Sequence, residues 1–141
     1  MFNASLSSIF ILFTSISLGQ SIRDFKTKTT ANEKERTEIL NLARKDIYAQ
    51  FDQEVVFVVN HLKVSGNFAW FEGTVLRKDG NPMEFPDEAY DCCHAEGLFM
   101  RKNGHWTIVE FGAFSTDCWY CGINMRYPNV PKGVFSQHVI Y

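Results

Sequence analysis

The dipeptide Asn103-Gly104 constrains the fold of this chain more than any other feature of the sequence. It separates two stretches with strand character, residues 92–101 and 105–114, and Asn-Gly is typical of the two-residue turns that join antiparallel strands. The sequence therefore predicts a β-hairpin, and with it an antiparallel sheet. A regular two-residue loop pairs Leu98 with Val109, Glu96 with Phe111, His94 with Ala113 and Cys92 with Ser115.

A second hairpin is predicted upstream, where the turn residues Gly66-Asn67 separate the stretches 55–64 and 68–76. Both stretches are rich in β-branched and aromatic residues. The expected register sorts apolar from polar side chains onto opposite faces, as a sheet with one buried face requires. It pairs Leu62 with Phe71, Val64 with Ala69 and Val58 with Val75 on one face, and His61 with Glu72 and Lys63 with Trp70 on the other.

An amphipathic helix is predicted over residues 33–51. Asn32 can cap its first turn, with Glu35 three residues later as in a capping box. Apolar residues recur at steps of three and four, which gives the helix one continuous stripe to bury. That stripe consists of Ile39, Leu40, Ala43, Ile47 and Phe51.

Together these elements predict one α+β domain over residues 32–141. One N-terminal amphipathic helix packs on a curved four-stranded antiparallel sheet. Residues 20–31 are polar and are expected to form a flexible leader. The acidic stretch after Lys78 is expected to form a long loop, and the C-terminal tail, residues 116–141, is expected to pack as irregular chain over one sheet edge.

One helix followed by four antiparallel strands resembles the cystatin-like and nuclear-transport-factor-2-like α+β rolls. The resemblance covers residues 33–115. The stretches 64–73 and 104–110 are also similar to small exported bacterial proteins of unassigned function. The resemblance implies a curved sheet wrapped around a helix, with a conical pocket. Rolls of this kind include binders, inhibitors and enzymes, so the resemblance does not decide the function.

Residues 1–19 predict a secretory signal. They contain no Lys, Arg, Asp or Glu, and their apolar run is too short to span a bilayer. The small residues Ser17 and Gly19 favour cleavage before Gln20, which predicts a secreted or periplasmic protein without a membrane span. The net charge is −2, from 14 Lys and Arg against 16 Asp and Glu. This balance argues against nucleic acid as a partner.

Four cysteines occur as an adjacent pair, Cys92 and Cys93, and a spaced pair, Cys118 and Cys121. An oxidising compartment favours disulfides, and the hairpin brings Cys92 and Cys93 close to Ser115. We therefore expect at least one bridge between the two pairs, fastening the tail. A redox pair at Cys118 and Cys121 is an alternative, as are free or intermolecular thiols. A zinc site that adds His94 as a ligand is another. No cofactor is expected.

His94 and Glu96 are the candidate catalytic residues. They lie two apart on one predicted strand, and in a concavity an imidazole beside a buried carboxyl can act as general acid and base. A hydrogen-bonded pair near the sheet edge is the alternative. The first hypothesis is an exported non-enzymatic domain that binds a small molecule or a protein. The second is a small hydrolase or isomerase that uses His94 and Glu96. A concavity filled by Phe and Leu side chains would favour the binding domain, and an open pocket over His94 and Glu96 the enzyme.

Overall fold

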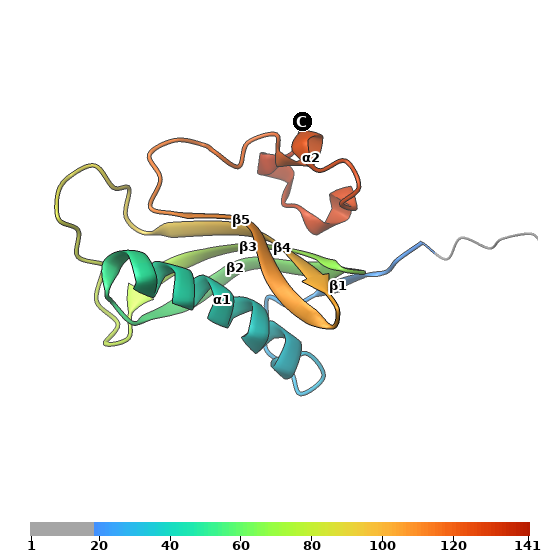
Figure 1. The fold of residues 1–141 in the computed structure, drawn as a ribbon, viewed down its shortest axis with the longest axis horizontal. Helices are drawn as coiled ribbons and strands as arrows, with labels where there is room; N and C mark the ends of the chain where they lie inside the picture. The colour runs from blue at the N-terminus through green and yellow to red at the C-terminus, as the bar shows by residue number, and fades with distance from the viewer. Residues whose placement is uncertain (1–18) are drawn as a thin grey trace, which may run out of the picture.

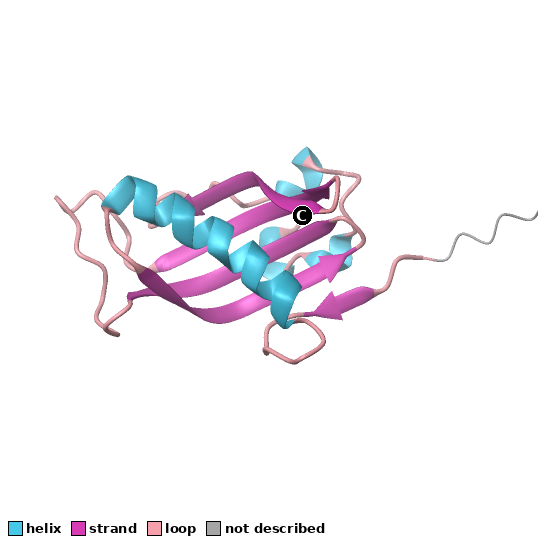
Figure 2. Ribbon diagram, turned by 60° about the horizontal axis from the view of Figure 1, so that its bottom comes forward, coloured by secondary structure: helices cyan, strands magenta, loops and turns pink. Residues whose placement is uncertain are grey.

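The computed structural model describes residues 19–141 as a three-layer arrangement (Figures 1 and 2). A five-stranded sheet forms the middle layer. A long helix covers one face, the helix side, and the C-terminal tail covers the other, the tail side. The elements in chain order are β1 (Ile22–Asp24), α1 (Glu33–Phe51), β2 (Val55–Ser65), β3 (Phe68–Arg77), β4 (His94–Lys102), β5 (His105–Ala113), α2 (Ile123–Arg126), η1 (Lys132–Val134) and η2 (Gln137–Val139).

All strand pairs are antiparallel and the sheet order is β1-β2-β3-β4-β5. Both predicted hairpins are confirmed, because Ser65 pairs with Phe68 and Lys102 pairs with His105 across two-residue loops. At the second loop Asn103 has φ 51° and Gly104 has φ 80°. These left-handed angles at both central residues match the twist of the flanking strands.

Each hairpin contains a one-residue register shift that the sequence analysis did not predict. In β2 the shift falls between Val59 and His61, so that Val75 pairs with Phe57 and not with Val58. In the β4–β5 pair it falls between Leu98 and Phe99. The predicted registers are therefore correct close to each turn and wrong by one residue beyond the bulge. The predicted pairs Leu98 with Val109, Glu96 with Phe111 and His94 with Ala113 are replaced by Leu98 with Glu110, Glu96 with Gly112 and Ala95 with Ala113.

The helix has the predicted bounds, and it packs on the sheet through the predicted stripe. Ile39, Leu40, Ala43 and Ile47 are buried, and Phe51 packs against the same core from a partly buried position. Asn32 makes no side-chain cap on the helix. Its side chain accepts from the Thr29 N–H at 2.9 Å, so it organises the turn before the helix. The sheet supplies the other half of this core, including Leu62, Val64, Phe71, Val75 and Phe99.

The fifth strand, β1, lies within residues 20–31, which are predicted from the sequence to form a flexible leader. Ile22 pairs with Ser65 and Asp24 pairs with Lys63, which extends the sheet beyond the four predicted strands. Arg23 holds the strand to α1 through two hydrogen bonds to Glu35, of 2.9 and 3.2 Å. The four-strand prediction was wrong because backbone pairing and this ion pair order a segment that has no apolar pattern.

The tail packs on the face of the sheet opposite α1, and not over a sheet edge as predicted (Figure 1). Trp70 from β3 and Leu98 from β4 are fully buried there, against tail residues that are themselves buried: Ile123, Val130, Val134, Phe135 and Val139. A hydrogen bond of 2.8 Å from the Gly122 N–H, just before α2, to the Val139 carbonyl at the end of η2 joins these two short helices. The tail thus closes a second apolar core.

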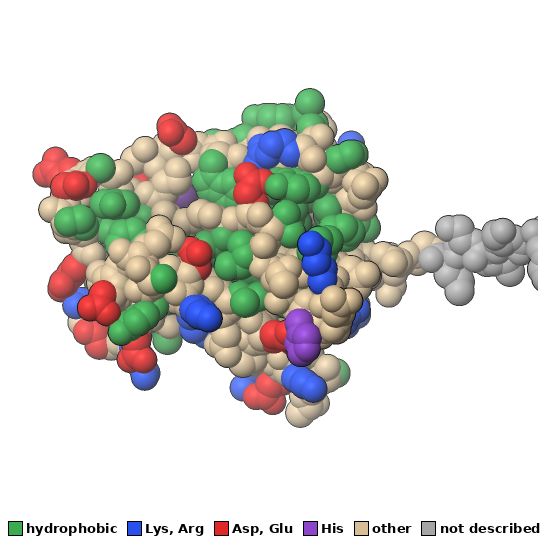
Figure 3. Space-filling view, viewed as in Figure 1, with side chains coloured by type: hydrophobic (Ala, Val, Ile, Leu, Met, Phe, Trp, Pro, Cys, Tyr) green, Lys and Arg blue, Asp and Glu red, His purple; other side chains and the backbone are tan. Residues whose placement is uncertain are grey.

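The connection between β3 and β4 carries exposed acidic residues at one end of the molecule, on the left in Figure 3. It also contributes apolar residues to the helix side. Met83 is buried in that core, and Phe85 stacks on Tyr90 with ring centroids 5.0 Å apart. Phe51 and Phe114 complete an aromatic cluster that closes this end of the layer between α1 and the sheet.

The predicted signal segment and its cleavage site before Gln20 lie almost wholly outside the described residues, which begin at Gly19. Within residues 19–141, the helices are all too short or too polar to cross a membrane.

Candidate functional site

The predicted pair, His94 and Glu96, lies on the tail side of β4. The side chains of β4 alternate between the two faces, and Glu96 shares its face with Leu98, which is buried under the tail. Directly opposite Glu96 on β3 is a second carboxylate, Glu72. The pair therefore does not line the concavity over α1, where the sequence analysis placed a possible catalytic site.

Both ring nitrogens of His94 face oxygen atoms. Nδ1 lies 2.7 Å from Glu96 Oε1, and Nε2 lies 3.0 Å from the Ser115 carbonyl oxygen. A carbonyl can only accept, so Nε2 carries a proton and donates. One further proton then serves the contact between Nδ1 and the Glu96 carboxyl, whichever of the two holds it. With both nitrogens engaged, His94 connects β4 to the start of the tail.

Glu96 is the most perturbed acid of the tail side. It is only 5% exposed, and its Oε2 has no hydrogen-bond partner among the described residues. Burial raises the pKa of Glu96 above its ordinary value because it disfavours the charged form. The bond from His94 lowers that pKa, and the charge of Glu72 raises it further. Glu96 is therefore a buried carboxyl that ionises less readily than an exposed one, next to the His94 imidazole.

Glu72 is a site residue that the sequence analysis did not single out. It was expected to form an exposed pair with His61, but it is 9% exposed and it binds the tail. Its Oε1 accepts from Trp70 Nε1 at 2.6 Å and from Ser136 Oγ, and its Oε2 lies 3.3 Å from His138 Nε2. The signal that could have found it is a carboxylate between apolar neighbours in a strand. We call Glu72, Glu96, His94, Ser136 and His138 the carboxylate cluster.

One member of the carboxylate cluster, Ser136, borders a cavity of about 630 Å³. Neither His94 nor Glu96 lines this cavity or the other two well-formed cavities, of about 530 and 340 Å³, in the described part of the chain. The cluster satisfies most of its own polar atoms and fastens the tail to the sheet. Its arrangement fits the structural alternative for His94 and Glu96 better than acid–base catalysis.

The cysteines form two close pairs that are compatible with disulfide bonds, and each pair is local. Cys92 lies next to Cys93, and Cys118 lies next to Cys121 with Cα atoms 5.4 Å apart. The expected bridge between the two pairs is not formed. Within residues 19–141, no group of three or more His, Cys, Asp or Glu side chains is placed to hold a metal ion, so the proposed zinc ligands are not assembled.

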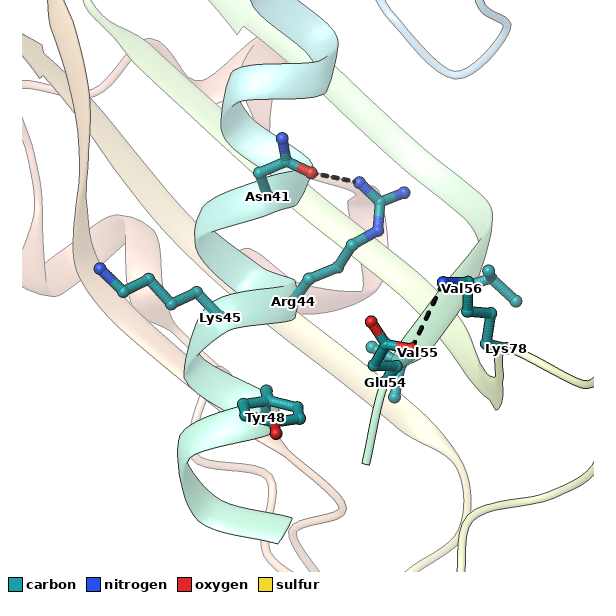
Figure 4. A pocket seen from close by; sticks show the side chains of 8 residues that line it. All are labelled: Asn41, Arg44, Lys45, Tyr48, Glu54, Val55, Val56 and Lys78. Carbon is teal, nitrogen blue, oxygen red and sulfur yellow. Dashed lines mark hydrogen bonds and ion pairs between the residues drawn. The ribbon is translucent and has the colours of Figure 1, made fainter. Parts of the chain in front are cut away.

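A groove lies between α1 and the first half of β2 (Figure 4). Its volume is about 530 Å³. The helix contributes polar and basic residues, and the strand contributes its first residues. The lining consists of Asn41, Arg44, Lys45, Tyr48, Glu54, Val55, Val56 and Lys78. We call this the α1–β2 groove.

The α1–β2 groove carries an excess of positive charge. Arg44 extends from the helix toward β2 (Figure 4) and donates to Asn41 Oδ1 at 2.7 Å. Its guanidinium carbon lies over the Phe57 ring, 5.4 Å from the ring centroid, which is a cation–π contact. Lys78 pairs with Glu54 at 3.3 Å. Among the described residues Arg44 has no carboxylate partner, and burial lowers the pKa of its guanidinium. Arg44 is therefore a partly buried cation that faces the groove.

The outer edge of β2 runs alongside this groove. β1 pairs only with Lys63, Val64 and Ser65, so residues 55–60 have a strand partner on the β3 side alone within the described chain. Val56 is 38% exposed and Val58 is 53% exposed. We call the outer side of residues 55–60 the β2 edge.

In comparisons with known proteins, no protein-family model, no curated protein and no solved structure matches this chain. The resemblance to cystatin-like and nuclear-transport-factor-2-like rolls stays a prediction based on the order of helix and strands.

Proposed function

We propose that this chain is an exported, non-enzymatic domain that binds a polypeptide partner in the α1–β2 groove. The observation that carries the proposal is the position of the β2 edge beside the groove. One surface presents three features together. They are the backbone donors and acceptors of the β2 edge, the Arg44 guanidinium, which has no carboxylate partner among the described residues, and the exposed side chains of Val56 and Val58. Strand edges with free hydrogen-bonding groups are common sites for recognition of extended peptides.

The filled interior on the helix side supports a binding domain over the alternative enzyme. Phe71, Phe99, Phe114, Leu40 and Leu62 occupy the space between α1 and the sheet, and each is at most 2% exposed. A side-chain-filled concavity leaves the surface cavities, among them the α1–β2 groove, as places for a ligand. The hydrolase or isomerase alternative depends on His94 and Glu96, whose polar atoms are mostly engaged by the carboxylate cluster.

Export is part of the proposal and rests on the signal-like segment at residues 1–19. The two close cysteine pairs are compatible with disulfide bonds, and disulfides persist in oxidising compartments. A secreted or periplasmic location agrees with both features.

Panning a phage-displayed library of random twelve-residue peptides tests the binding function. We expect peptides that bind the protein and lose binding to Arg44→Glu, while keeping it for Lys34→Glu. Lys34 is an exposed cation on the same helix outside the groove, so the control carries the same change of charge. Failure to enrich any peptide, or equal binding to both variants, would overturn the proposal.

A further inference from the structure

The backbone of the β2 edge is arranged to accept another strand. Residues 55–59 read Val-Val-Phe-Val-Val, and they bond to β3 on one side only within residues 19–141. Natural sheets protect such edges with lysine, proline or an overlying segment, because a bare apolar edge pairs with other chains. The β2 edge has neither lysine nor proline between Val55 and Asn60. Its sequence is therefore suited to being covered by a partner strand.

An added strand would meet two different environments on its two faces. Phe57 and Val59 point to the helix side, where Arg44 and the α1–β2 groove lie. Val56 and Val58 alternate with them along the strand and are exposed, and Val56 also contributes to the lining of the groove. Because the side chains of a strand alternate between faces, every second residue of the partner would approach the groove and the others would lie beside the valines.

The charge of the groove selects an acidic partner. Arg44, Lys45 and Lys78 line it together with one carboxylate, Glu54, which already pairs with Lys78. Lys45 points away from β2 in Figure 4, so Arg44 is the cation best placed to meet the partner. A carboxylate can bind a guanidinium through two parallel hydrogen bonds, which is a strong and oriented contact.

The same charge disfavours a second copy of the chain as the occupant. Antiparallel pairing of two β2 edges would bring the two α1 helices side by side and Arg44 of one copy toward Arg44 of the other. Like charges placed together across an interface oppose association. A foreign acidic strand meets no such opposition.

We infer that the partner segment is an extended, acidic peptide that adds to the β2 edge as a sixth strand, with glutamate or aspartate side chains toward Arg44 and apolar side chains beside Val56 and Val58. This inference rests on the proposed function and names the class of ligand for the same groove.

Three blocked eight-residue peptides test the inference by fluorescence polarisation. The first alternates valine with glutamate, the second replaces each glutamate by lysine, and the third keeps the glutamates but carries N-methyl groups on alternate backbone nitrogens. Two versions of the third peptide cover both sets of alternate nitrogens. We expect the glutamate peptide to bind at least about tenfold more tightly than the lysine peptide and than one of the methylated versions.

Charge reversal provides the matched variant. Arg44→Glu should weaken the glutamate peptide by about tenfold or more and improve binding of the lysine peptide, whereas Lys34→Glu should change neither. Val58→Asp should also weaken the glutamate peptide, since it places a charge beside the apolar side chains. Circular dichroism spectra that match that of the parent protein exclude unfolding of each of these three variants.

The outcomes separate the inference from the function on which it rests. If panning yields groove-dependent peptides that are neutral or basic, or that tolerate N-methylation at both sets of positions, the acidic strand is wrong while the binding function stands. If no peptide depends on the groove, both fail. A dimer in sedimentation equilibrium that Val58→Asp dissociates would assign the edge to a second copy and overturn the inference.

Discussion

The two faces of the sheet are covered in different ways. On the helix side a single nineteen-residue helix buries a regular stripe against apolar side chains of the sheet. On the tail side, short helical turns and loops bury Trp70 and Leu98, but the carboxylate cluster lies at the margin of that core. Polar contacts fasten both layers, but those of α1, such as Arg23 with Glu35, lie at the surface, whereas those of the tail involve the buried carboxylates Glu72 and Glu96.

This difference predicts unequal sensitivity to change. A continuous helix that packs along its length loses stability over the whole domain when one buried residue is truncated. A tail held partly by hydrogen bonds can loosen locally while the helix and sheet stay folded. Four measurements test this contrast, from the largest expected effect to the smallest.

Ile47→Ala should have the largest effect. Ile47 is fully buried between α1 and the sheet, and truncating a buried isoleucine lowers the free energy of unfolding by about 2 to 5 kcal/mol. Urea denaturation measures this change. Met125→Ala is the control, because Met125 is 68% exposed and its truncation should change stability by less than about 0.5 kcal/mol. Equal effects would contradict the packing of α1.

Glu72→Ala should loosen the tail. The change removes the acceptor for Trp70 Nε1 and Ser136 Oγ, and a buried donor left without a partner lowers stability by about 1 to 3 kcal/mol. Hydrogen exchange should accelerate over residues 116–141 more than in α1. Glu110→Ala is the control, since Glu110 forms an exposed pair with Arg126 at 3.0 Å, worth less than about 1 kcal/mol. Uniform acceleration over the whole domain would show that the tail is not a separate layer.

Glu96→Gln should alter how stability depends on pH. Burial raises the pKa of Glu96 in the folded protein above its ordinary value of 4.5. A raised carboxyl pKa contributes stability that is fully present below the unfolded pKa and is lost as the pH rises through the folded pKa. The free energy of unfolding of the parent protein should therefore fall relative to Glu96→Gln from about pH 4.5 upward.

Urea denaturation at a series of pH values measures this difference. His94 Nδ1 lies 2.7 Å from the Glu96 carboxyl, so a parallel series with His94→Gln separates the burial of the carboxyl from its contact with the imidazole. Curves for the parent and Glu96→Gln that run parallel at all pH values would rule out a buried, perturbed carboxyl.

Each cysteine pair should form its bridge within a single tryptic peptide, so only two peptides should change in mass on reduction. Trypsin cleaves at Lys78, Arg101, Lys102 and Arg126, so each pair falls in a peptide of its own. Without reduction, each peptide should appear separately and lighter than its reduced form by the hydrogens lost in one bridge. A single product that joins the two peptides would restore the bridge between pairs that the sequence suggested.

The sequence predicts the helix and both turns because those features depend on neighbours in the chain. The stripe from Ile39 to Ile47 and the dipeptide Asn103-Gly104 each have one favourable local structure. The bulges could not be read in this way. Val109 belongs to the tail-side core while Ile108 and Phe111 belong to the helix-side core, and apolar residues on both faces hide the point where alternation breaks.

The candidate site was only partly predictable for the same reason. His94 and Glu96 do form a hydrogen-bonded pair, and two residues on one face of a strand can be expected to meet. Their partner Glu72 is buried because the tail, more than 60 residues later in the chain, places Ser136 over it, as the 64-residue separation of the two shows. The α1–β2 groove likewise depends on where β1 stops pairing with β2, which no local pattern records.

The bulge between Val59 and His61 has a consequence for how the surface of this protein can change over time. Without that extra residue, Val58 would share a face with Val75 and point into the core, and Phe57 would point outward. Chain length within β2, and not only the identity of its residues, thus determines which side chains are displayed between Val55 and Val59. Loss of one residue at the bulge would exchange the displayed set for the concealed one, which no single substitution can do.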